Sequence, residues 1–260
     1  MKSENDDFVL VILQARMSSK RLPGKVISQV NNKPLLTLLL DRIKMCDLVD
    51  EIIVATTSNK SDDVIEKLAI QQAVKVFRGD DNDVLSRFAK ASEISPCETI
   101  VRITGDCPFV DPQILTEVIN IYKQGNYDYV SNTNPPTFPD GLDVEVFSKK
   151  VLLEANKFSE SPNEKEHVTP WILNNRNLKK KNVFNNKDLS QLRWTVDYPE
   201  DLELIKIILS KFKNRNDFSW KEILNLVEQN PSIYSINEHI KRNDGYSISD
   251  GQKLWRRAKK

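Results

Sequence analysis

The sequence predicts an α/β fold in which helices cover a mostly parallel sheet, and three observations lead to this prediction. Strand-like and helix-like segments alternate from residue 8 to about residue 123. The first segment, residues 8–13, is apolar throughout, as expected of a strand that is buried on both faces. With 260 residues, 39% of them hydrophobic, the chain suits one sizeable α/β domain, with or without a small appendage.

The first half of the chain contains this alternation. Strands are expected over residues 8–13, 51–56, 74–77 and 98–104, and helices over residues 34–46, 64–72, 84–93 and 112–123. Ser61, Asp62 and Asp63 can cap the second of these helices, and Asp111 followed by Pro112 opens the fourth.

The second half is less regular. Strands are expected over residues 127–131, 143–147 and 192–196, and helices over residues 149–158, 164–175, 199–213 and 220–229. Residues 132–141 are rich in turn-forming residues and form the longest expected loop. The residues after Asn230 are polar and are expected to be irregular.

The composition narrows the classes of protein to which the chain can belong. A net charge of +1 argues against nucleic acid as the main partner, and no apolar run approaches the length of a membrane span. The polar, acidic first residues do not resemble a signal peptide. Three scattered cysteines without a CxxC pair argue against a disulfide framework and a zinc site, so a reducing cytoplasm is the simplest compartment. Two histidines are too few for a multi-histidine metal centre.

The most informative stretch is residues 14–25, QARMSSKRLPGK, directly after the first strand. Four cations, Arg16, Lys20, Arg21 and Lys25, stand within ten residues, and small residues between them let the backbone approach a ligand closely. A strand that runs into a small, basic loop is a common way for α/β proteins to hold phosphate. The loop matches neither the Walker pattern nor G-x-G-x-x-G. The alternative is a solvated basic turn.

Two aspartates follow other expected strands. The fourth strand runs into Asp106 and the last into Asp197, and ligands of open α/β sheets bind beyond the carboxyl ends of the strands. Mg²⁺ takes oxygen ligands, typically one or two carboxylates with phosphate oxygens and water. The pattern therefore predicts Mg²⁺ as cofactor, held by Asp106 and Asp197 beside a polyphosphate. For each aspartate alone, the alternative is a cap on the next helix.

Further polar residues in the second half are candidates for contacts with a polar substrate. Asp140, Asp143 and Glu145 could hydrogen-bond its hydroxyls or amine, and on a strand Asp143 and Glu145 share one face. The alternative is a solvated edge strand. His167 is either structural or a substrate contact, and Arg193 is either an anion clamp or a surface residue.

These motifs carry a resemblance to a known family. Residues 14–25 resemble the signature of the CMP-sugar synthetases, approximately ARxGSKRLPGK, with Ser18 where the family commonly has glycine. Other segments resemble the spore-coat polysaccharide, SpsF-like branch of the cytidylyltransferases. They are VFRGDDNDVLSRF, VRITGDCPFVDP, DYVSNT, FPDGLDVEVFS, EHVTPWI and LRWTVDYPEDLELI. The resemblance covers about residues 8–210, with the segments in the same order as in the family.

The resemblance implies a Rossmann-like, three-layer α/β/α nucleotidyltransferase fold. It implies transfer of CMP from CTP to a sugar acid or a small phosphorylated or phosphonate acceptor, with release of pyrophosphate, in surface polysaccharide biosynthesis. The catalytic residues would be Arg16, Lys25, Asp106 and Asp197, of which Asp106 and Asp197 would hold the Mg²⁺. The nucleotide would be bound by Gln14, Ala15, Arg16, Met17, Ser18, Ser19, Arg21, Lys25, Arg78 and Thr104. The acceptor would be bound by Asp140, Asp143, Glu145, His167 and Arg193.

The chain is expected to divide into a cytidylyltransferase domain, residues 1–230, and a polar C-terminal tail, residues 231–260. Residues 249–260 resemble the opening helix of glutamate-semialdehyde-type, PLP-dependent aminotransferases. The tail is therefore expected either to lead to a fused or partner aminotransferase or to be an ordinary basic tail. A homodimer is expected from the family alone. Two other functions stay open here: a nucleotidyltransferase that uses another nucleoside triphosphate, and a non-catalytic domain that binds a nucleotide or a sugar.

Overall fold

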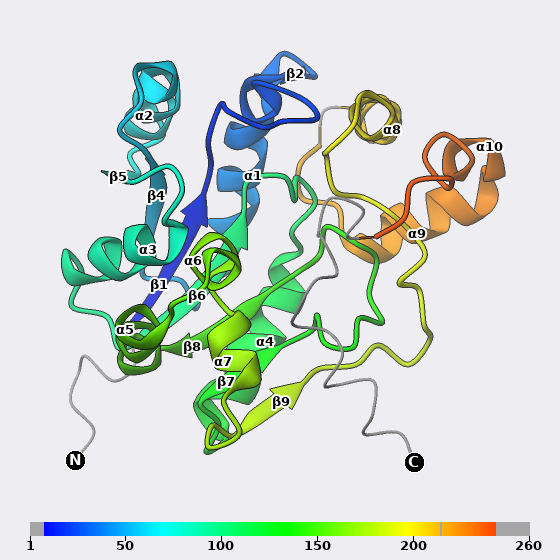
Figure 1. The fold of residues 1–260 in the computed structure, drawn as a ribbon. Coiled ribbons are helices and arrows are strands. Elements are labelled where there is room, and N and C mark those ends of the chain that lie inside the picture. The colour runs from blue at the N-terminus through cyan, green and yellow to red at the C-terminus, as the bar shows by residue number, and fades with distance from the viewer. Residues whose placement is uncertain (1–7, 214, 243–260) are drawn as a thin grey trace.

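A seven-stranded sheet with the order β5-β4-β1-β6-β8-β7-β9 forms the centre of the molecule (Figure 1). The computed structural model describes residues 8–213 and 215–242. The strands are β1 (Val9–Gln14), β4 (Glu51–Thr57), β5 (Lys75–Gly79), β6 (Thr99–Thr104), β7 (Tyr129–Ser131), β8 (Glu145–Ser148) and β9 (Lys180–Asn182). Because β8 is antiparallel to β6 and β7 while the other neighbours are parallel, the sheet is mostly parallel, as expected.

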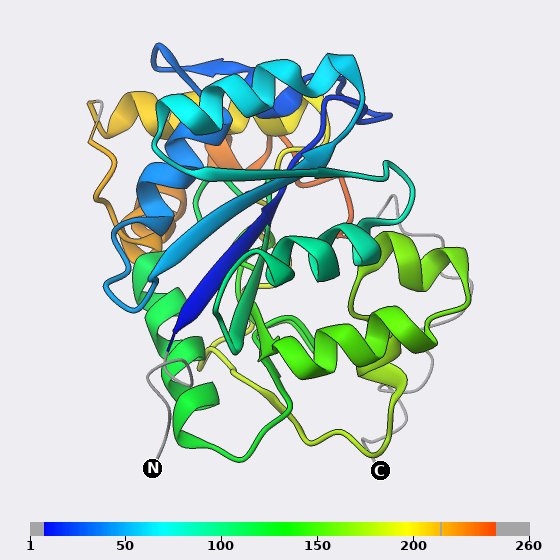
Figure 2. The ribbon, with the colours of Figure 1, turned by 90° about the vertical axis from the view of Figure 1, so that its left-hand side faces the viewer.

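Helices pack on both sides of this sheet and give three layers (Figure 2). The core on one side includes α1 (Leu35–Ile43), α2 (Asp63–Gln71), α4 (Pro112–Gln124), α8 (Pro199–Lys211), α9 (Trp220–Gln229) and α10 (Pro231–Tyr234). The other side is covered by α3 (Val84–Glu93), α5 (Lys149–Phe158), α6 (Pro162–His167) and α7 (Pro170–Asn174). Within the described residues, no helix combines the length and the apolar character needed to cross a bilayer.

The central strand β1 contributes to the cores on both sides of the sheet. Val9, Val11 and Leu13 belong to the core that contains α1, and Leu10 and Ile12 to the core that contains α3. All five side chains are completely buried. This confirms that the continuous apolar run is a strand covered on both faces.

The strand order locates the edge at which a ligand can bind. From β1 the chain passes to β4 and β5 on one side, and it then crosses to β6 on the other side of β1. The connections that follow β1 and β6 therefore lead toward opposite edges of the sheet. Ligand crevices of open α/β sheets lie beyond the carboxyl ends of the strands at such a reversal.

The helix predicted over residues 164–175 is wrong, because the chain forms two short helices there, α6 and α7. Val168 separates them with a φ of 69°, outside the right-handed helical region. Pro170 has no amide hydrogen to donate to the preceding turn, and it fits the first position of a helix. It therefore begins α7 instead of continuing α6.

The strand predicted over residues 192–196 is also wrong, because this segment does not join the sheet. Arg193 forms an isolated parallel bridge with Asp140, in which Trp194 N donates to the Asp140 carbonyl at 2.7 Å. Gly141 makes this contact sterically accessible. Its φ is 102°, and a Cβ there would lie 2.6 Å from the carbonyl carbon of Trp194.

Several short elements differ from the sequence-based expectation. The strand expected over residues 143–147 begins only at Glu145, so Asp143 lies outside it. β9 and the hairpin β2 (Gln29–Val30) and β3 (Lys33–Pro34) were not expected, because two or three residues carry too little periodicity. α10 forms at the start of the tail that was expected to be irregular, and packs against α8 and α9. Residues 249–260, with their resemblance to aminotransferases, lie outside the described residues.

Arg42 on α1 ties this helix to the segments that precede α4 and α9. Its buried guanidinium donates to the carbonyls of Val110 at 2.8 Å, Asn216 at 2.7 Å and Phe218 at 3.0 Å. Burial lowers the pKa of Arg42 to about 10, although the charge of Asp111, 3.8 Å away, acts to raise it. The side chain therefore stays charged at neutral pH while it satisfies three backbone acceptors.

We expect Arg42→Met to lower the free energy of unfolding by about 3 kcal/mol, because three carbonyl groups lose their donor. Lys44→Met is the matched control at the end of the same helix, since the bond of Lys44 to the Gln72 carbonyl is exposed. Its effect should stay within about 0.5 kcal/mol. Urea unfolding followed by circular dichroism measures both changes. Equal effects of the two substitutions would contradict the role of Arg42.

Candidate active site

The carboxyl ends of β1 and β6 meet at the reversal of strand order. Gln14 and Thr104 are register partners, and Gly105 N donates to the Gln14 carbonyl at 2.8 Å. A Cβ on Gly105 would also lie 2.8 Å from that oxygen, so a larger residue would push the two strand ends apart. This close approach brings the loop after β6 against the basic loop after β1.

The start of the basic loop is anchored by a buried carboxylate. Met17 N donates to Asp62 Oδ1 at 2.9 Å, and Asp62 also accepts from Thr56 and Thr57. Burial acts to raise the pKa of Asp62, but these hydrogen bonds outweigh it and lower the pKa. The expected capping of α2 by Asp62 is therefore wrong, because the side chain binds the loop and makes no cap bond. The 3-10 helix η2 (Lys25–Ile27) then begins with the buried Lys25.

Lys25 joins the two aspartates that lie far apart in the sequence. Its side chain is 11% exposed, and Nζ donates to Asp106 Oδ2 at 3.0 Å, to Asp197 Oδ1 at 2.9 Å and to the Val196 carbonyl at 2.8 Å. Burial acts to lower the pKa of Lys25, but the charges of Asp106 and Asp197 outweigh it and raise the pKa. The ammonium therefore stays charged and holds both carboxylates against the basic loop.

The two carboxylates stay ionised in this setting. Burial acts to raise the pKa of each, and the charge of Asp197 also raises the pKa of Asp106, because like charges lie close together. The charge and hydrogen bonds of Lys25, with hydrogen bonds from Thr104 to Asp106 and from Arg21 to Asp197, together outweigh these effects, so both pKa values fall below their usual range. Arg21 contributes as well, with its Nη2 2.7 Å from Asp197 Oδ1.

The donor set fits a hard metal ion that shares its ligands with a phosphate. Asp106 and Asp197 supply ionised oxygens, the ligand type that Mg²⁺ prefers, and Mg²⁺ commonly completes its shell with phosphate oxygens and water. Across residues 8–213 and 215–242, no group of three or more histidine, cysteine or acidic side chains is placed to hold a metal. The pair therefore suits Mg²⁺ that arrives with a phosphate-bearing ligand, and not a metal bound by protein alone.

Arg193 extends this network into the C-terminal part of the chain. Its side chain is only 4% exposed, which excludes the interpretation as a surface residue. It donates to both oxygens of Asp201 at 2.9 and 3.0 Å, to Asp140 at 3.1 Å and to Asp197 at 3.2 Å. Burial acts to lower the pKa of Arg193, but the three carboxylates outweigh it and raise the pKa. Asn237 also donates to Asp201, at 2.8 Å.

Asp140 and Asp143 share a second arginine from beyond α10. Arg242 Nη2 lies 2.6 Å from Asp143 Oδ1 and 3.8 Å from Asp140 Oδ1. Burial raises the pKa of Asp140 to about 6, and the charge of Asp143 adds to this, although Arg242 and Arg193 act to lower it. Asp140 therefore exchanges its proton near pH 6.

Glu145 belongs to a different polar cluster, on the side of the sheet that carries α6 and α7. It pairs with Arg102, and it accepts from Tyr129 at 2.6 Å and from Thr169 at 2.8 Å. Arg102 also donates to Gln14 Oε1 at 3.0 Å. Asp143 and Glu145 therefore bind different arginines, and they do not act as one acidic face.

The remaining predicted cations bind other partners. Arg16 lies 3.1 Å from Asp81 and 3.7 Å from Glu166 of α6. Arg78 pairs with Asp63 and Glu66 at the start of α2, at 2.7 and 2.6 Å. Arg16 and Arg78 thus take part in ion pairs that are separate from the Lys25 network.

The remaining predicted site residues include small residues of the basic loop and His167. Ala15 is buried, Ser18 is exposed and Ser19 is half-buried. His167 ends α6. Burial lowers its pKa, helped by Arg102 and Arg16 and opposed by Glu166, so the imidazole is neutral at pH 7.

Three charged residues of these networks were not expected from the sequence. Arg102 carried a signal, since it is the one charged residue of its strand and has apolar residues on both sides. Asp201 carried another, because it stands at the third position of α8, where an acidic side chain completes a capping box. Arg242 carried none, because its partner Asp143 lies 99 residues earlier in the chain.

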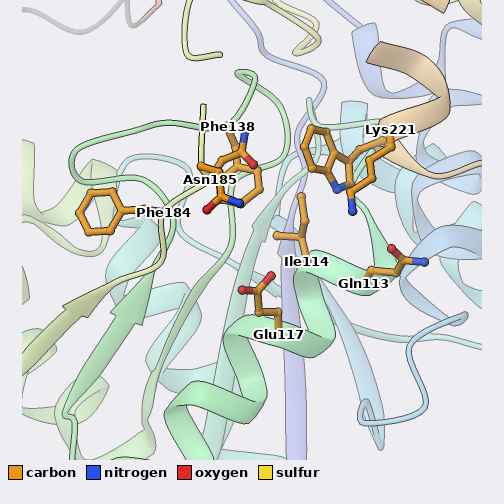
Figure 3. Close-up of a pocket in the computed structure, with 9 residues that line it drawn as sticks. Gln113, Ile114, Glu117, Phe138, Phe184, Asn185 and Lys221 are labelled. Atoms are coloured by element: carbon orange, nitrogen blue, oxygen red, sulfur yellow. The ribbon is translucent and has the colours of Figure 1, made fainter. Parts of the chain in front are cut away.

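A separate pocket of about 220 Å³ lies between α4, α9 and two loops (Figure 3). It is lined by Gln113, Ile114, Glu117, Phe138, Phe184, Asn185, Asn186, Trp220 and Lys221. None of these is a predicted site residue. Polyphosphate chemistry needs the convergent cations and carboxylates that surround Lys25. We therefore place the candidate active site at Lys25 and not in this pocket.

Comparisons with known proteins identify the family of this chain. The sequence matches the cytidylyltransferase family over residues 10–240. The spore coat polysaccharide biosynthesis protein SpsF of Bacillus subtilis is 34% identical over 238 residues, which cover 88% of this chain and 98% of that protein. An uncharacterised protein of Methanocaldococcus jannaschii is 35% identical over 237 residues, which cover 90% of this chain and 96% of the relative.

Solved structures show the same relationship. A cytidylyltransferase from Leptospira borgpetersenii serovar Hardjo-bovis has a TM-score of 0.83 at 34% identity, with 87% of this chain and 96% of that chain covered. A CMP:2-keto-3-deoxy-manno-octonic acid synthetase in complex with CTP has a TM-score of 0.60 at 17% identity, with 79% and 99% covered, and so shares the fold. The chain therefore belongs to the cytidylyltransferase family and is a CTP-dependent nucleotidyltransferase.

Proposed function

We propose that this enzyme transfers CMP from CTP to a sugar acid, or to a small phosphorylated or phosphonate acceptor, with Mg²⁺ as cofactor and release of pyrophosphate. One observation carries the proposal: Lys25 of the basic loop binds both Asp106 and Asp197. The cations suited to a triphosphate and the carboxylates suited to a metal therefore occupy one place.

The relatives support the choice of acceptor and pathway. The name of the SpsF relative refers to spore coat polysaccharide biosynthesis, and that of the octonic acid synthetase to a sugar acid. We accordingly propose a role in surface polysaccharide biosynthesis, in the cytoplasm. The expected homodimer and the fused or partner aminotransferase stay predictions, as does the domain boundary at residue 230.

In the proposed reaction, an acceptor oxygen attacks the α-phosphorus of CTP in line with the bond to the β-phosphate. A phosphorus–oxygen bond to the acceptor forms, the α–β anhydride bond breaks, and a hydroxyl acceptor releases its proton to water. No covalent enzyme intermediate is needed, so catalysis rests on positioning and charge neutralisation. When bound to Asp106 and Asp197, Mg²⁺ would neutralise phosphate charge as a Lewis acid.

The protein side chains have distinct roles in this proposal. Lys25 would exchange its carboxylate partners for phosphate oxygens, which leaves Asp106 and Asp197 available to the metal. Arg21 is 31% exposed and pairs with Asp197, so it can reach the triphosphate from the same loop. Arg193 keeps its bonds to Asp201 and Asp197, and so holds the Asp197 carboxylate ionised and in place.

On the acceptor side, the three acids differ in their contacts. Asp140 lies beside the reaction centre, because Arg193 binds both Asp140 and Asp197. Asp143 is bound by Arg242, and Glu145 by Arg102. Asp140 is therefore the acid best placed to accept a hydrogen bond from an acceptor hydroxyl.

A screen of nucleotides and acceptors tests the reaction. We expect pyrophosphate release with CTP and Mg²⁺ in the presence of an acidic acceptor, and far less with UTP, GTP or ATP. The panel comprises sugar acids, sugar and polyol phosphates, phosphonates and neutral sugars. A preference for another nucleotide would favour the rival nucleotidyltransferase function. Tight binding of CTP without turnover on any acceptor would contradict the proposal and favour a non-catalytic domain.

We expect Asp106→Asn to lower kcat about 100-fold or more, because the amide removes one charged ligand of the proposed metal. The variant should stay folded, since the amide keeps the shape of the side chain, although its weaker bond to Lys25 should lower the thermal midpoint. Asp217→Asn is the control, because Asp217 is exposed and pairs with the exposed Arg215, away from the Lys25 network. Initial rates of pyrophosphate release measure the effect. Near-normal turnover of Asp106→Asn would contradict the metal assignment.

The raised pKa of Asp140 predicts a pH-dependent loss of stability. Its pKa is about 6 in the folded protein and 3.8 ordinarily, so the folded state holds the proton more tightly. The stability of the wild type relative to Asp140→Asn, which mimics the neutral form, should therefore fall as the pH rises from about 4 to about 6. The total change should be about 3 kcal/mol. Urea unfolding of both proteins between pH 4 and 7.5 measures it, and a pH-independent difference would show that the pKa is not raised.

A further inference from the structure

A chain of polar side chains runs across one face of the sheet and ends at Gln14. Tyr129 and Thr169 donate to one oxygen of Glu145, and the other oxygen of Glu145 pairs with Arg102. Arg102 Nη2 then donates to Gln14 Oε1 at 3.0 Å. The side chains of Glu145 and Arg102 are only 8% and 14% exposed. The proposed transfer of CMP assigns no role to this cluster.

Strand register explains how the chain forms. Arg102 of β6 is the partner of Glu145 on β8, and Thr104 of β6 is the partner of Gln14 on β1. Because residues two apart on a strand share a face, Arg102 and Thr104 lie on the same side of β6. Arg102 is therefore the diagonal neighbour of Gln14, and its guanidinium spans three strands between Glu145 and Gln14.

Each bond in the chain has a fixed direction. An ionised carboxylate only accepts and a guanidinium only donates, so the amide oxygen of Gln14 must face Arg102. Burial and the charge of Glu145 raise the pKa of Tyr129 well above its usual range, so its hydroxyl stays a donor. The NH₂ group of Gln14 is thereby turned away from Arg102, at the strand end where the basic loop begins.

Stability alone does not account for the buried pair. An apolar pair of similar volume commonly stabilises a core as well as a buried ion pair does. Arg102 Nε is buried and has no hydrogen-bond partner among the described residues, which costs stability. An arginine that is buried at such a cost, and that binds the first residue of the basic loop, points to a role in the site.

We propose that Arg102 is a positioning residue, which fixes the amide of Gln14 so that its NH₂ donates to an oxygen of the bound nucleotide. Glu145 acts by holding Arg102 and does not touch the acceptor. The inference rests on the proposed function, since it assumes that CTP occupies the loop after β1. The phosphate and ribose oxygens of CTP are hydrogen-bond acceptors of the kind that this NH₂ requires.

A double-mutant cycle tests the proposal with four proteins: wild type, Gln14→Ala, Arg102→Met and the double variant. The affinity for CTP with Mg²⁺ is measured by calorimetry, and kcat and KM for CTP by pyrophosphate release with the best acceptor of the screen. We expect each single substitution to weaken CTP binding about tenfold. The double variant should bind CTP no more weakly than Gln14→Ala, because Arg102 acts through Gln14.

Arg42→Met separates this role from a general loss of stability. Arg42 is also a buried arginine, and its substitution should lower the thermal midpoint without changing the affinity for CTP. Effects of Gln14→Ala and Arg102→Met that multiply in the double variant would overturn the proposal. Normal CTP affinity of Arg102→Met would also overturn it.

The outcomes distinguish this inference from the proposed function. If the wild type binds CTP but releases no pyrophosphate with any acceptor, the proposed reaction is wrong. The CTP affinities of the four proteins in the double-mutant cycle then still test the role of Arg102. If the wild type does not bind CTP, both fail.

Discussion

The arrangement of the candidate active site depends on one buried ammonium group. Lys25 Nζ lies 3.0 Å from Asp106 and 2.9 Å from Asp197, two carboxylates that would otherwise repel each other. Because the ammonium binds both, the loop after β6 and the segment before α8 can meet the loop after β1. The same three side chains would provide a cation for phosphate and two oxygen ligands for a metal. The ion pairs that hold these segments together are therefore also the groups that the proposed chemistry needs.

Two buried arginines stabilise different parts of the structure around Lys25. Arg193 connects Asp197 to Asp201 at the start of α8, and Asn237 binds Asp201 from beyond α10, so the C-terminal part of the described chain supports a carboxylate of the candidate active site. On the other side of the sheet, Arg102 is held between Glu145 and Gln14. Both arginines are tolerated in the interior because carboxylates lie within bonding distance of each guanidinium. The reversal of strand order at β1 brings both networks to the same edge.

Much of the fold and part of the site could be predicted from local patterns. The apolar run before the basic loop is a strand, and alternating strands and helices form a mostly parallel sheet, because periodicity and capping act over a few residues. Asp106 and Asp197 could be paired because both follow expected strands, and the carboxyl ends of parallel strands share an edge. The two aspartates do lie together, although the segment before Asp197 is not a strand of the sheet. An isolated bridge between Arg193 and Asp140 holds this segment beside the loop that contains Asp140.

The sequence by itself therefore determined the fold class, the basic loop and the identity of the two central carboxylates. Only the tertiary structure decided their partners. Lys25 meets Asp106 and Asp197 across 81 and 172 residues, and Arg242 reaches Asp143 across 99. Such contacts depend on how whole segments pack, which no local periodicity records. The break at Val168 and the burial of Arg193 were equally hidden, because backbone geometry and burial at these positions are set by neighbours that lie close only in the folded chain.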